Sequence, residues 1–216
     1  MINLIDRIIK AGFADRILTD VDLDNLFNGT SASRHGLVNK ALKKGDLVRI
    51  RRGLYLLADC YRHKKLSTFF LASRICPHSY ISEESALSCH GWIPERVSTV
   101  TGIIAHGRTK KFITPFGEFS FYHLPVREYE FLTGVRRVEE IKDEPFLLAS
   151  PLRALADLVY TKKIAWEGME FLTDGLRIEI DQLEQINPDH FSEIKNVYRS
   201  TRVLHFLDRL KEELKK

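Results

Sequence analysis

Cysteine and long apolar runs are scarce in this chain of 216 residues. The three cysteines, Cys60, Cys76 and Cys89, form no C-x-x-C pair, so the sequence predicts neither a disulfide framework nor a zinc site. No window comes near the roughly 18 uncharged apolar residues of a membrane span. The apolar N-terminal stretch contains three charged residues, unlike the uncharged centre of a signal peptide. We therefore expect a cytoplasmic protein with no membrane partner.

The chain also lacks the compact motifs of common enzyme classes. It has no Walker A, dinucleotide-binding, zinc-protease, nucleophile-elbow or EF-hand pattern. Its eight histidines fall at no metal-ligand spacing with another histidine or cysteine. Cys89 and His90 are adjacent, but adjacency alone does not place two side chains around one metal ion. We expect a protein that is not an enzyme and that needs no cofactor or metal.

One enzymatic alternative stays open, a metal-dependent nuclease that a DNA-binding domain delivers to its substrate. Glu83, Glu84 and Asp157 could belong to such a centre, although it requires several converging carboxylates. A structural interpretation is simpler. Glu83 and Glu84 fall in the first turn of a capped helix, where acids suit the helix dipole. Asp157 follows Arg153 by one helical turn and can pair with it.

Positive charge is concentrated in one segment. The whole chain has a net charge of +4, but residues 31–65 hold ten basic residues against two acidic ones, which leaves −4 for the rest. The ten are Arg34, Lys40, Lys43, Lys44, Arg49, Arg51, Arg52, Arg62, Lys64 and Lys65. An ordinary solvated surface mixes both signs. A basic block beside a mildly acidic body is typical of a nucleic-acid-binding module.

Hydrophobic spacing predicts three helices at the start of the chain, near residues 2–11, 20–27 and 31–44. Thr19 is the candidate N-cap of the second helix, and Thr30 or Ser31 that of the third, which Gly45 ends. The inner stripe of the third helix is expected to comprise Leu37, Val38, Ala41 and Leu42.

A β-hairpin is predicted to follow, in the segment KKGDLVRIRRGLYLL of residues 43–57. Period-two alternation places Val48 and Ile50 in the core and the neighbouring arginines outside, and Arg52-Gly53 forms the turn. Three helices followed by a hairpin are the order of a winged helix-turn-helix domain, which we expect over residues 1–62.

Residues 63–216 are predicted to form a second, mixed α+β domain with a helical tail. Strand-like patterns dominate residues 98–124, and Ser150-Pro151 provides a cap and a first-turn proline for a helix. The fold class expected for the whole chain is therefore α+β, with an N-terminal winged helix-turn-helix.

The second helix of a helix-turn-helix motif lies in the major groove of DNA. In the predicted third helix, Ser33 and Asn39 are placed to contact base edges, and Lys40 and Lys43 to hold phosphates. Two further candidates for DNA contact are less favourably placed, since Arg34 falls near the apolar stripe and His35 at its boundary.

Three arginines of the hairpin complete the predicted DNA-binding set. Arg49 and Arg51 point outward from the strand, and Arg52 occupies the turn. From such positions a hairpin reaches a flanking minor groove or the phosphate backbone. An isolated outward arginine is usually just solvated, but three in four positions beside a basic helix favour contact with DNA.

These features resemble those of the AbiEi-type antitoxins of bacterial abortive-infection toxin–antitoxin systems. The resemblance rests on DLVRIRRGLYLL, YISEESALSCHGWIPE, FGEFSFYHLP and SPLRALADLVY, in this order, and weakens after Trp166. It departs from the expected pattern at Cys89-His90 and at Leu152, where an acidic residue is expected.

The resemblance implies an autorepressor and antitoxin of a phage-defence operon. Its winged helix would bind inverted repeats in double-stranded operator DNA, and its C-terminal domain would counter a nucleotidyltransferase-like toxin. Such antitoxins are commonly of type IV, which act without a stable complex with the toxin. Besides this hypothesis and the nuclease alternative, a third stays open, in which the C-terminal domain is an interaction module that binds the toxin directly.

Overall fold

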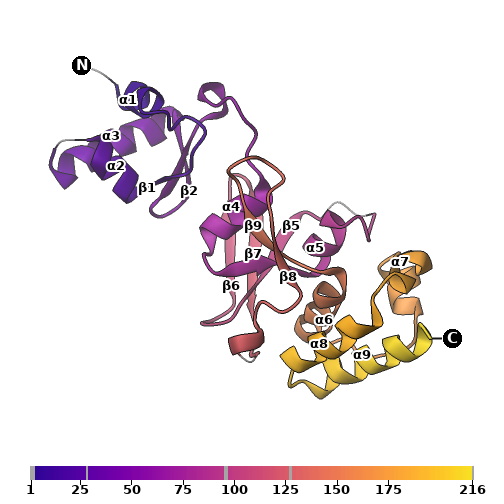
Figure 1. Cartoon of the computed structure of the whole chain (residues 1–216). Helices are drawn as coiled ribbons and strands as arrows, with labels where there is room; N and C mark the ends of the chain where they lie inside the picture. Colours follow the sequence, from indigo (N-terminus) through magenta and orange to yellow (C-terminus); the bar gives the residue numbers. More distant parts are fainter. Residues whose placement is uncertain (1–2, 28, 95–96, 127, 216) are drawn as a thin grey trace. The chain divides into compact units, whose positions relative to one another are not determined.

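The computed structural model of the chain describes residues 3–27, 29–94, 97–126 and 128–215. Two compact units make up the chain (Figure 1). The first comprises Met1–Thr68 together with Ile113–Phe116, and the second comprises Phe69–Phe112 together with Gly117–Lys216. No helix in the described part of the chain is both long enough and apolar enough to cross a bilayer.

The first unit contains the three helices and the hairpin that the sequence predicts. The helices are α1 (Leu4–Lys10), α2 (Asp20–Leu26) and α3 (Ser31–Lys44). The hairpin strands are β2 (Leu47–Arg51) and β3 (Leu54–Leu57), and a 3-10 turn, η1 (Asp59–Tyr61), follows them. A short strand that was not predicted, β1 (Leu18–Thr19), pairs with β3 and completes an antiparallel sheet in the order β1-β3-β2.

Side-chain caps begin α2 and α3 where the sequence predicts them. Thr19 accepts a hydrogen bond from the backbone N–H of Asp22, whose carboxylate accepts in return from the backbone N–H of Thr19. Thr30 accepts one from the N–H of Ser33. Gly45 ends α3 at a φ of 76°, a left-handed conformation that glycine adopts without strain. A side-chain N-cap such as Thr19 or Thr30 stabilises a helix by about 1 kcal/mol.

The core of the first unit differs from the predicted one at the sheet. Its strand residues are Leu18, Leu47, Tyr55 and Leu57, and its helix residues are Leu4, Ile5, Ile8, Leu23, Val38 and Ala41. Ile50 was expected inside and is buried, at 4% exposure, although it lies outside the cluster that contains Leu47, whereas Val48, also expected inside, is only half-buried. Leu37, expected in the inner stripe of α3, is 40% exposed.

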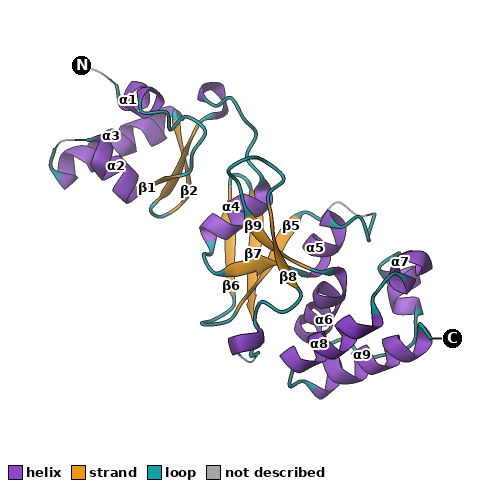
Figure 2. Cartoon of the chain, in the orientation of Figure 1, coloured by secondary structure: helices purple, strands orange, loops and turns teal. Residues whose placement is uncertain are grey.

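The second unit is built on a six-stranded mixed sheet in the order β6-β7-β5-β4-β9-β8 (Figure 2). The strands are β4 (Ser79–Ile81), β5 (Thr99–Ile104), β6 (Lys110–Thr114), β7 (Gly117–His123), β8 (Val135–Val138) and β9 (Phe146–Ala149). β5 pairs with β7 and β4 with β9 in parallel, whereas β4–β5 and β8–β9 are antiparallel. The mixed sheet confirms the α+β class.

Helices before and after the sheet complete this unit. α4 (Thr68–Ile75) precedes it, α5 (Glu83–Cys89) follows β4, and the turn η2 (Glu128–Glu130) precedes β8. α6 (Pro151–Lys162), the π-helical turn η3 (Phe171–Gly175), α7 (Ile180–Glu184), α8 (Pro188–Val197) and α9 (Thr201–Glu213) follow it. α8 and α9 pack on α6 through a buried apolar face (Figure 1). Ser150 caps α6 and Pro151 is its first residue, as predicted.

The interior of the second unit contains an ion pair that is closed off from water. Arg153 and Asp157 of α6 are both 0% exposed, and Nε of Arg153 lies 3.2 Å from Oδ1 of Asp157, which confirms the predicted pairing. Asp157 also accepts hydrogen bonds from Tyr80, at 2.9 Å, from Ser82, at 2.7 Å, and from Tyr198.

The other two nitrogens of the Arg153 guanidinium group also donate hydrogen bonds. Its Nη1 donates to the backbone carbonyl of Thr133 at 2.9 Å, and its Nη2 donates to the hydroxyl of Tyr80 at 2.6 Å. Burial, and then the charge of Asp157, raise the pKa of Tyr80 and Tyr198 well above the ordinary range, so both phenols stay protonated and donate. The five polar side chains form the buried polar network of the second unit: Tyr80, Ser82, Arg153, Asp157 and Tyr198.

Breaking this network from one side should be costly. We expect Arg153→Met to lower the free energy of unfolding by about 3–5 kcal/mol, because Asp157 would stay buried without its countercharge. Urea unfolding followed by circular dichroism measures this. The matched control is Arg209→Met, which removes an exposed ion pair with Glu212 and should cost about 0.5 kcal/mol or less. Equal midpoints for the two variants would contradict the role assigned to Arg153.

Candidate nucleic-acid interface

Six of the nine residues predicted to contact DNA lie on α3. Five of them are exposed: Ser33, His35, Asn39, Lys40 and Lys43. Val38 and Ala41 hold the opposite face of the helix in the core. Gly36 lies among the exposed residues, and a Cβ atom placed there would meet nothing within 4 Å. The outer face of α3 is therefore open enough for a phosphate backbone or a base edge to come close.

Arg34 is occupied within the protein. Its guanidinium forms an ion pair with Asp24 of α2 and contacts the hydroxyl of Ser31 at 3.4 Å, and its side chain is only 14% exposed. The sequence placed Arg34 near the apolar stripe, and the structure shows how this position is accommodated. The arginine ties α3 to α2, which leaves it less available to DNA than the five exposed residues.

Arg49 and Arg51 do not both point outward from the strand, as alternation predicted. A register shift between Arg49 and Arg51 interrupts the pairing of β2 with β3. Such a bulge re-aims the side chains that follow it. Arg49 is exposed with its guanidinium 5.9 Å from the ring centroid of Tyr55, and Arg52 is exposed in the turn that Gly53 closes at a φ of 78°. Arg51 is half-buried, and its Nε is buried without a hydrogen-bond partner among the described residues.

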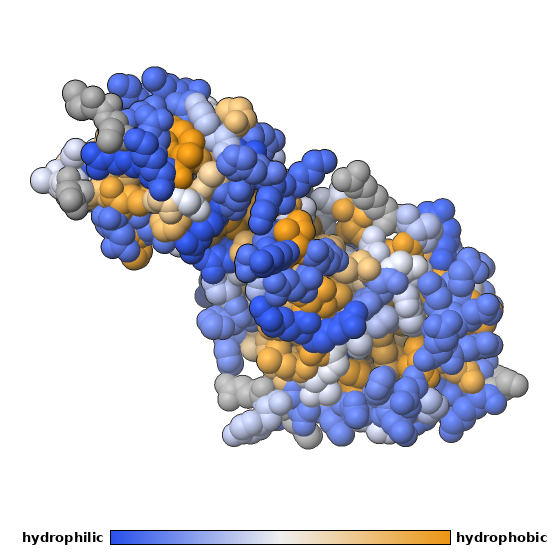
Figure 3. Space-filling model, turned by 45° about the horizontal axis from the view of Figure 1, so that its top comes forward, coloured by the Kyte–Doolittle hydropathy of each residue, from blue (hydrophilic) through white to orange (hydrophobic). Residues whose placement is uncertain are grey.

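Several cations of the first unit have no countercharge. Lys40, Lys43, Lys44, Arg49 and Arg52 form no ion pair with any residue that the structure describes. Hydrophilic side chains dominate the surface of this unit on the face shown in Figure 3. Uncompensated cations on one helix and one turn produce a local positive potential, which attracts phosphate.

Lys44 is one functional candidate that the helical projection missed. It was counted in the basic block but not assigned to the interface, and it is exposed in the last turn of α3 beside Lys43.

The backbone at the end of the basic segment is held by Asp15. Its Oδ1 accepts hydrogen bonds from the backbone N–H groups of His63, at 2.6 Å, and Lys64, at 3.1 Å. Partial burial raises the pKa of Asp15, but these donors outweigh it and hold the value below the ordinary one.

Asp157 and Glu84, two residues of the nuclease alternative, are held by different partners. Asp157 belongs to the buried polar network, and Glu84 forms an ion pair with Lys162, with 4.0 Å between Oε1 and Nζ. Cys89 donates to Glu140, and His90 contacts the backbone carbonyl of Ala149. Within the described residues, no group of three or more histidine, cysteine or acidic side chains is arranged to hold a metal ion.

Glu83 occupies an unusual place at the start of α5. It is 0% exposed, neither carboxylate oxygen has a hydrogen-bond partner among the described residues, and its φ is 53°. Burial, and then the charge of Glu84, raise its pKa from 4.5 to about 8, and the charge of Lys162 offsets this only in part. The carboxyl is therefore neutral in the folded protein at neutral pH. Its position in the first turn was predicted, but its burial was not.

No family model matches the sequence, and no curated protein matches it. Among solved structures, the chain is similar to the crystal structure of the RV2827C protein from Mycobacterium tuberculosis, with a TM-score of 0.63. The two are 13% identical, and the match covers 99% of this chain and 78% of that chain. At this level of identity the similarity concerns the fold alone.

The protonation of Glu83 should make stability depend on pH. The folded state holds the proton up to about pH 8, whereas the unfolded chain loses it near 4.5, so stability falls as pH rises between these values. Relative to wild type, Glu83→Gln should gain on the order of 1 kcal/mol per pH unit from about pH 5 to 8. Urea unfolding at several pH values measures this, with exposed Glu193→Gln as control. Parallel wild-type and Glu83→Gln profiles would show that Glu83 ionises normally.

Proposed function

We propose that this protein is a DNA-binding autorepressor whose first unit acts as a winged helix-turn-helix domain. α3 is the recognition helix in this proposal, and the β2–β3 hairpin with Arg52 in its turn is the wing. The observation that carries the proposal is the set of five exposed cations on α3 and the hairpin that form no ion pair with any described residue. Exposed Ser33 and Asn39 lie on the same helix and supply groups that can contact base edges.

The partner in this proposal is double-stranded operator DNA with inverted repeats. A helix-turn-helix protein that binds as a dimer places its two recognition helices one helical turn of DNA apart, so its operator has matching half-sites. The segment upstream of the protein's own gene is the natural first probe. Lys40 and Lys43 hold phosphates and set the affinity, whereas Ser33 and Asn39 discriminate between sequences.

We further infer that the second unit makes the protein an antitoxin against a nucleotidyltransferase-like toxin. This part of the proposal rests on the resemblance to the AbiEi-type antitoxins, which includes two segments that build the second unit. YISEESALSCHGWIPE covers β4 and α5, and SPLRALADLVY covers α6. These segments supply four of the five side chains of the buried polar network. The shared motifs therefore support a common scaffold for this unit.

The salt dependence of DNA binding tests the DNA-binding role. The variant Lys40→Ala/Lys43→Ala/Arg52→Ala should bind both the upstream fragment and a scrambled fragment more weakly. Because each lost phosphate contact removes about 0.9 from the slope of log K against log salt, the slope should flatten by up to about three. Fluorescence anisotropy at a series of salt concentrations measures both quantities.

The matched control removes the same charge from the second unit, where Arg108, Lys142 and Arg202 are exposed. Their triple alanine variant should keep the wild-type slope. If the two triple variants behaved alike, net charge rather than a located interface would explain the binding.

The antitoxin role is tested separately from DNA binding. The proposal expects a nucleotidyltransferase-like toxin to be encoded next to this chain. A strain that expresses such a toxin should recover growth when the wild-type chain is co-expressed. It should recover equally with Lys40→Ala/Lys43→Ala/Arg52→Ala, which loses repression only, because the altered residues lie outside the second unit.

Two outcomes separate the mechanisms of neutralisation. Rescue without co-purification of the two proteins indicates a type IV antitoxin, and co-purification at micromolar concentration indicates direct binding. Absence of rescue by the wild-type chain would refute the antitoxin role.

A further inference from the structure

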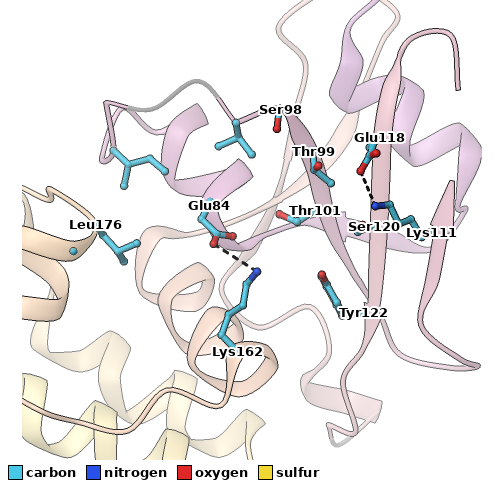
Figure 4. A pocket seen from close by; sticks show the side chains of 13 residues that line it. Glu84, Ser98, Thr99, Thr101, Lys111, Glu118, Ser120, Tyr122, Lys162 and Leu176 are labelled. Atoms are coloured by element: carbon cyan, nitrogen blue, oxygen red, sulfur yellow. Dashed lines mark ion pairs between the residues drawn. The ribbon is translucent and has the colours of Figure 1, made fainter. Parts of the chain in front are cut away.

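The second unit contains a pocket of about 560 Å³ that the proposed DNA-binding role does not use (Figure 4). All the residues that line it belong to this unit. They come from β5, β6 and β7 of the sheet and from α5 and α6, together with Ile93, Val97, Ser98, Gly175 and Leu176. Its volume falls within the range of small-molecule sites, about 300–1,000 Å³.

The floor of the pocket is a row of small hydroxyl side chains. β5 and β7 run in parallel with Thr99 beside Glu118 and Thr101 beside Ser120, so these side chains share one face of the sheet. The opposite face of β7 carries Phe119 and Phe121, both 0% exposed. Central strands usually bury apolar side chains on both faces when helices cover both, and here one face is polar instead.

Two hydroxyl groups of this floor are available to a ligand. Ser120 is 8% exposed and Tyr122 is half-buried, and neither hydroxyl makes a hydrogen bond to any residue that the structure describes. Neither hydroxyl is among the buried atoms that lack a partner, so both are accessible from the pocket. A ligand or water in the pocket can therefore form hydrogen bonds with these two groups.

Two ion pairs flank the hydroxyl floor. Glu84 of α5 faces Lys162 of α6 on one wall, and Lys111 of β6 faces Glu118 of β7 on the other (Figure 4). The Lys111–Glu118 pair is closed at 2.7 Å, and its hydrogen bond lowers the pKa of Glu118. The Glu84–Lys162 pair is open at 4.0 Å, too long for a direct hydrogen bond.

This arrangement selects among ligand classes. Each lysine is matched by a glutamate, so the pocket presents no net positive charge to an anion. A ligand hydroxyl placed between Glu84 and Lys162 can donate to the carboxylate and accept from the ammonium group at the same time. A neighbouring hydroxyl can reach Ser120 or Tyr122. Ile93 and Leu176 supply apolar surface for a sugar ring or a base.

We propose that the pocket binds a small uncharged ligand with vicinal hydroxyl groups, either the ribose of a nucleoside or a free sugar. The inference is independent of DNA binding and of the antitoxin role, since it rests only on groups inside the second unit. It gives the protein a small-molecule site in addition to its proposed operator interface.

Matched ligands test the proposal on the full chain. Isothermal titration calorimetry with adenosine, 2′,3′-dideoxyadenosine, ribose, glucose and AMP should give saturable binding of adenosine or of a sugar, and at least tenfold weaker binding of the dideoxy compound. Adenosine binding more tightly than ribose or glucose identifies a nucleoside site, and sugars binding as tightly as adenosine identify a sugar site.

Three results would overturn the proposal. The first is no binding of adenosine, ribose or glucose up to about 10 mM. The second is equal binding of adenosine and its dideoxy analogue, which would show that the hydroxyl groups are not recognised. The third is AMP binding at least tenfold more tightly than adenosine, which would identify an anion site.

Two conservative variants locate the site. Tyr122→Phe and Glu84→Gln should each weaken binding by roughly tenfold, because the first removes a hydroxyl from the pocket and the second replaces a charged acceptor by a neutral amide. Tyr129→Phe, at a 98% exposed tyrosine, and exposed Glu193→Gln are the matched controls and should bind as wild type does. Thermal unfolding of all four variants verifies that they are folded. Wild-type affinity in both folded pocket variants would place the ligand elsewhere and refute the assignment.

Discussion

The buried pair of Arg153 and Asp157 constrains the whole second unit. Two charges removed from water are stable only when their countercharge and their remaining hydrogen bonds are all in place. Those partners come from distant parts of the chain: Tyr80 and Ser82 at the end of β4, the carbonyl of Thr133 before β8, and Tyr198 between α8 and α9. The pair therefore fixes how the sheet, α6 and the helical tail meet, since losing any partner leaves charge unsatisfied.

The same network explains the unusual start of α5. Ser82 is the N-cap residue of this helix, but its hydroxyl donates to Asp157 and makes no capping hydrogen bond. The next residue, Glu83, has a left-handed backbone and a buried carboxyl, and Glu84 then projects to the wall of the pocket. The hydroxyl of Ser82 is thus bonded to the network and not to the start of α5, where the backbone of Glu83 is left-handed. Glu83 remains compatible with this place because it is protonated there.

The sequence predicted features that depend on neighbours along the chain. The caps at Thr19, Thr30 and Ser150, the end of α3 at Gly45, and the Arg153–Asp157 pair within one helix all follow local rules, and the structure contains them. What it did not predict depends on partners across the fold. The bulge in β2 arises from pairing with β3, and the buried place of Glu83 and the hydroxyl floor under the pocket arise from strand order. Periodicity within one strand contains no information about these partners.

The lysines at the pocket and the outer cations of α3 and the hairpin differ in their ion pairing. In the second unit the lysines at the pocket and on α8 are paired with Glu84, Glu118 and Asp208. In the first unit the outer cations of α3 and of the hairpin have no such partner among the described residues. Screening by salt weakens the attraction of unpaired surface cations to phosphate far more than the hydrogen bonding of a neutral ligand. The proposed DNA interface and the proposed ligand pocket therefore differ in charge, because the lysines at the pocket are paired with glutamates and the outer cations of α3 and the hairpin have no such partner among the described residues.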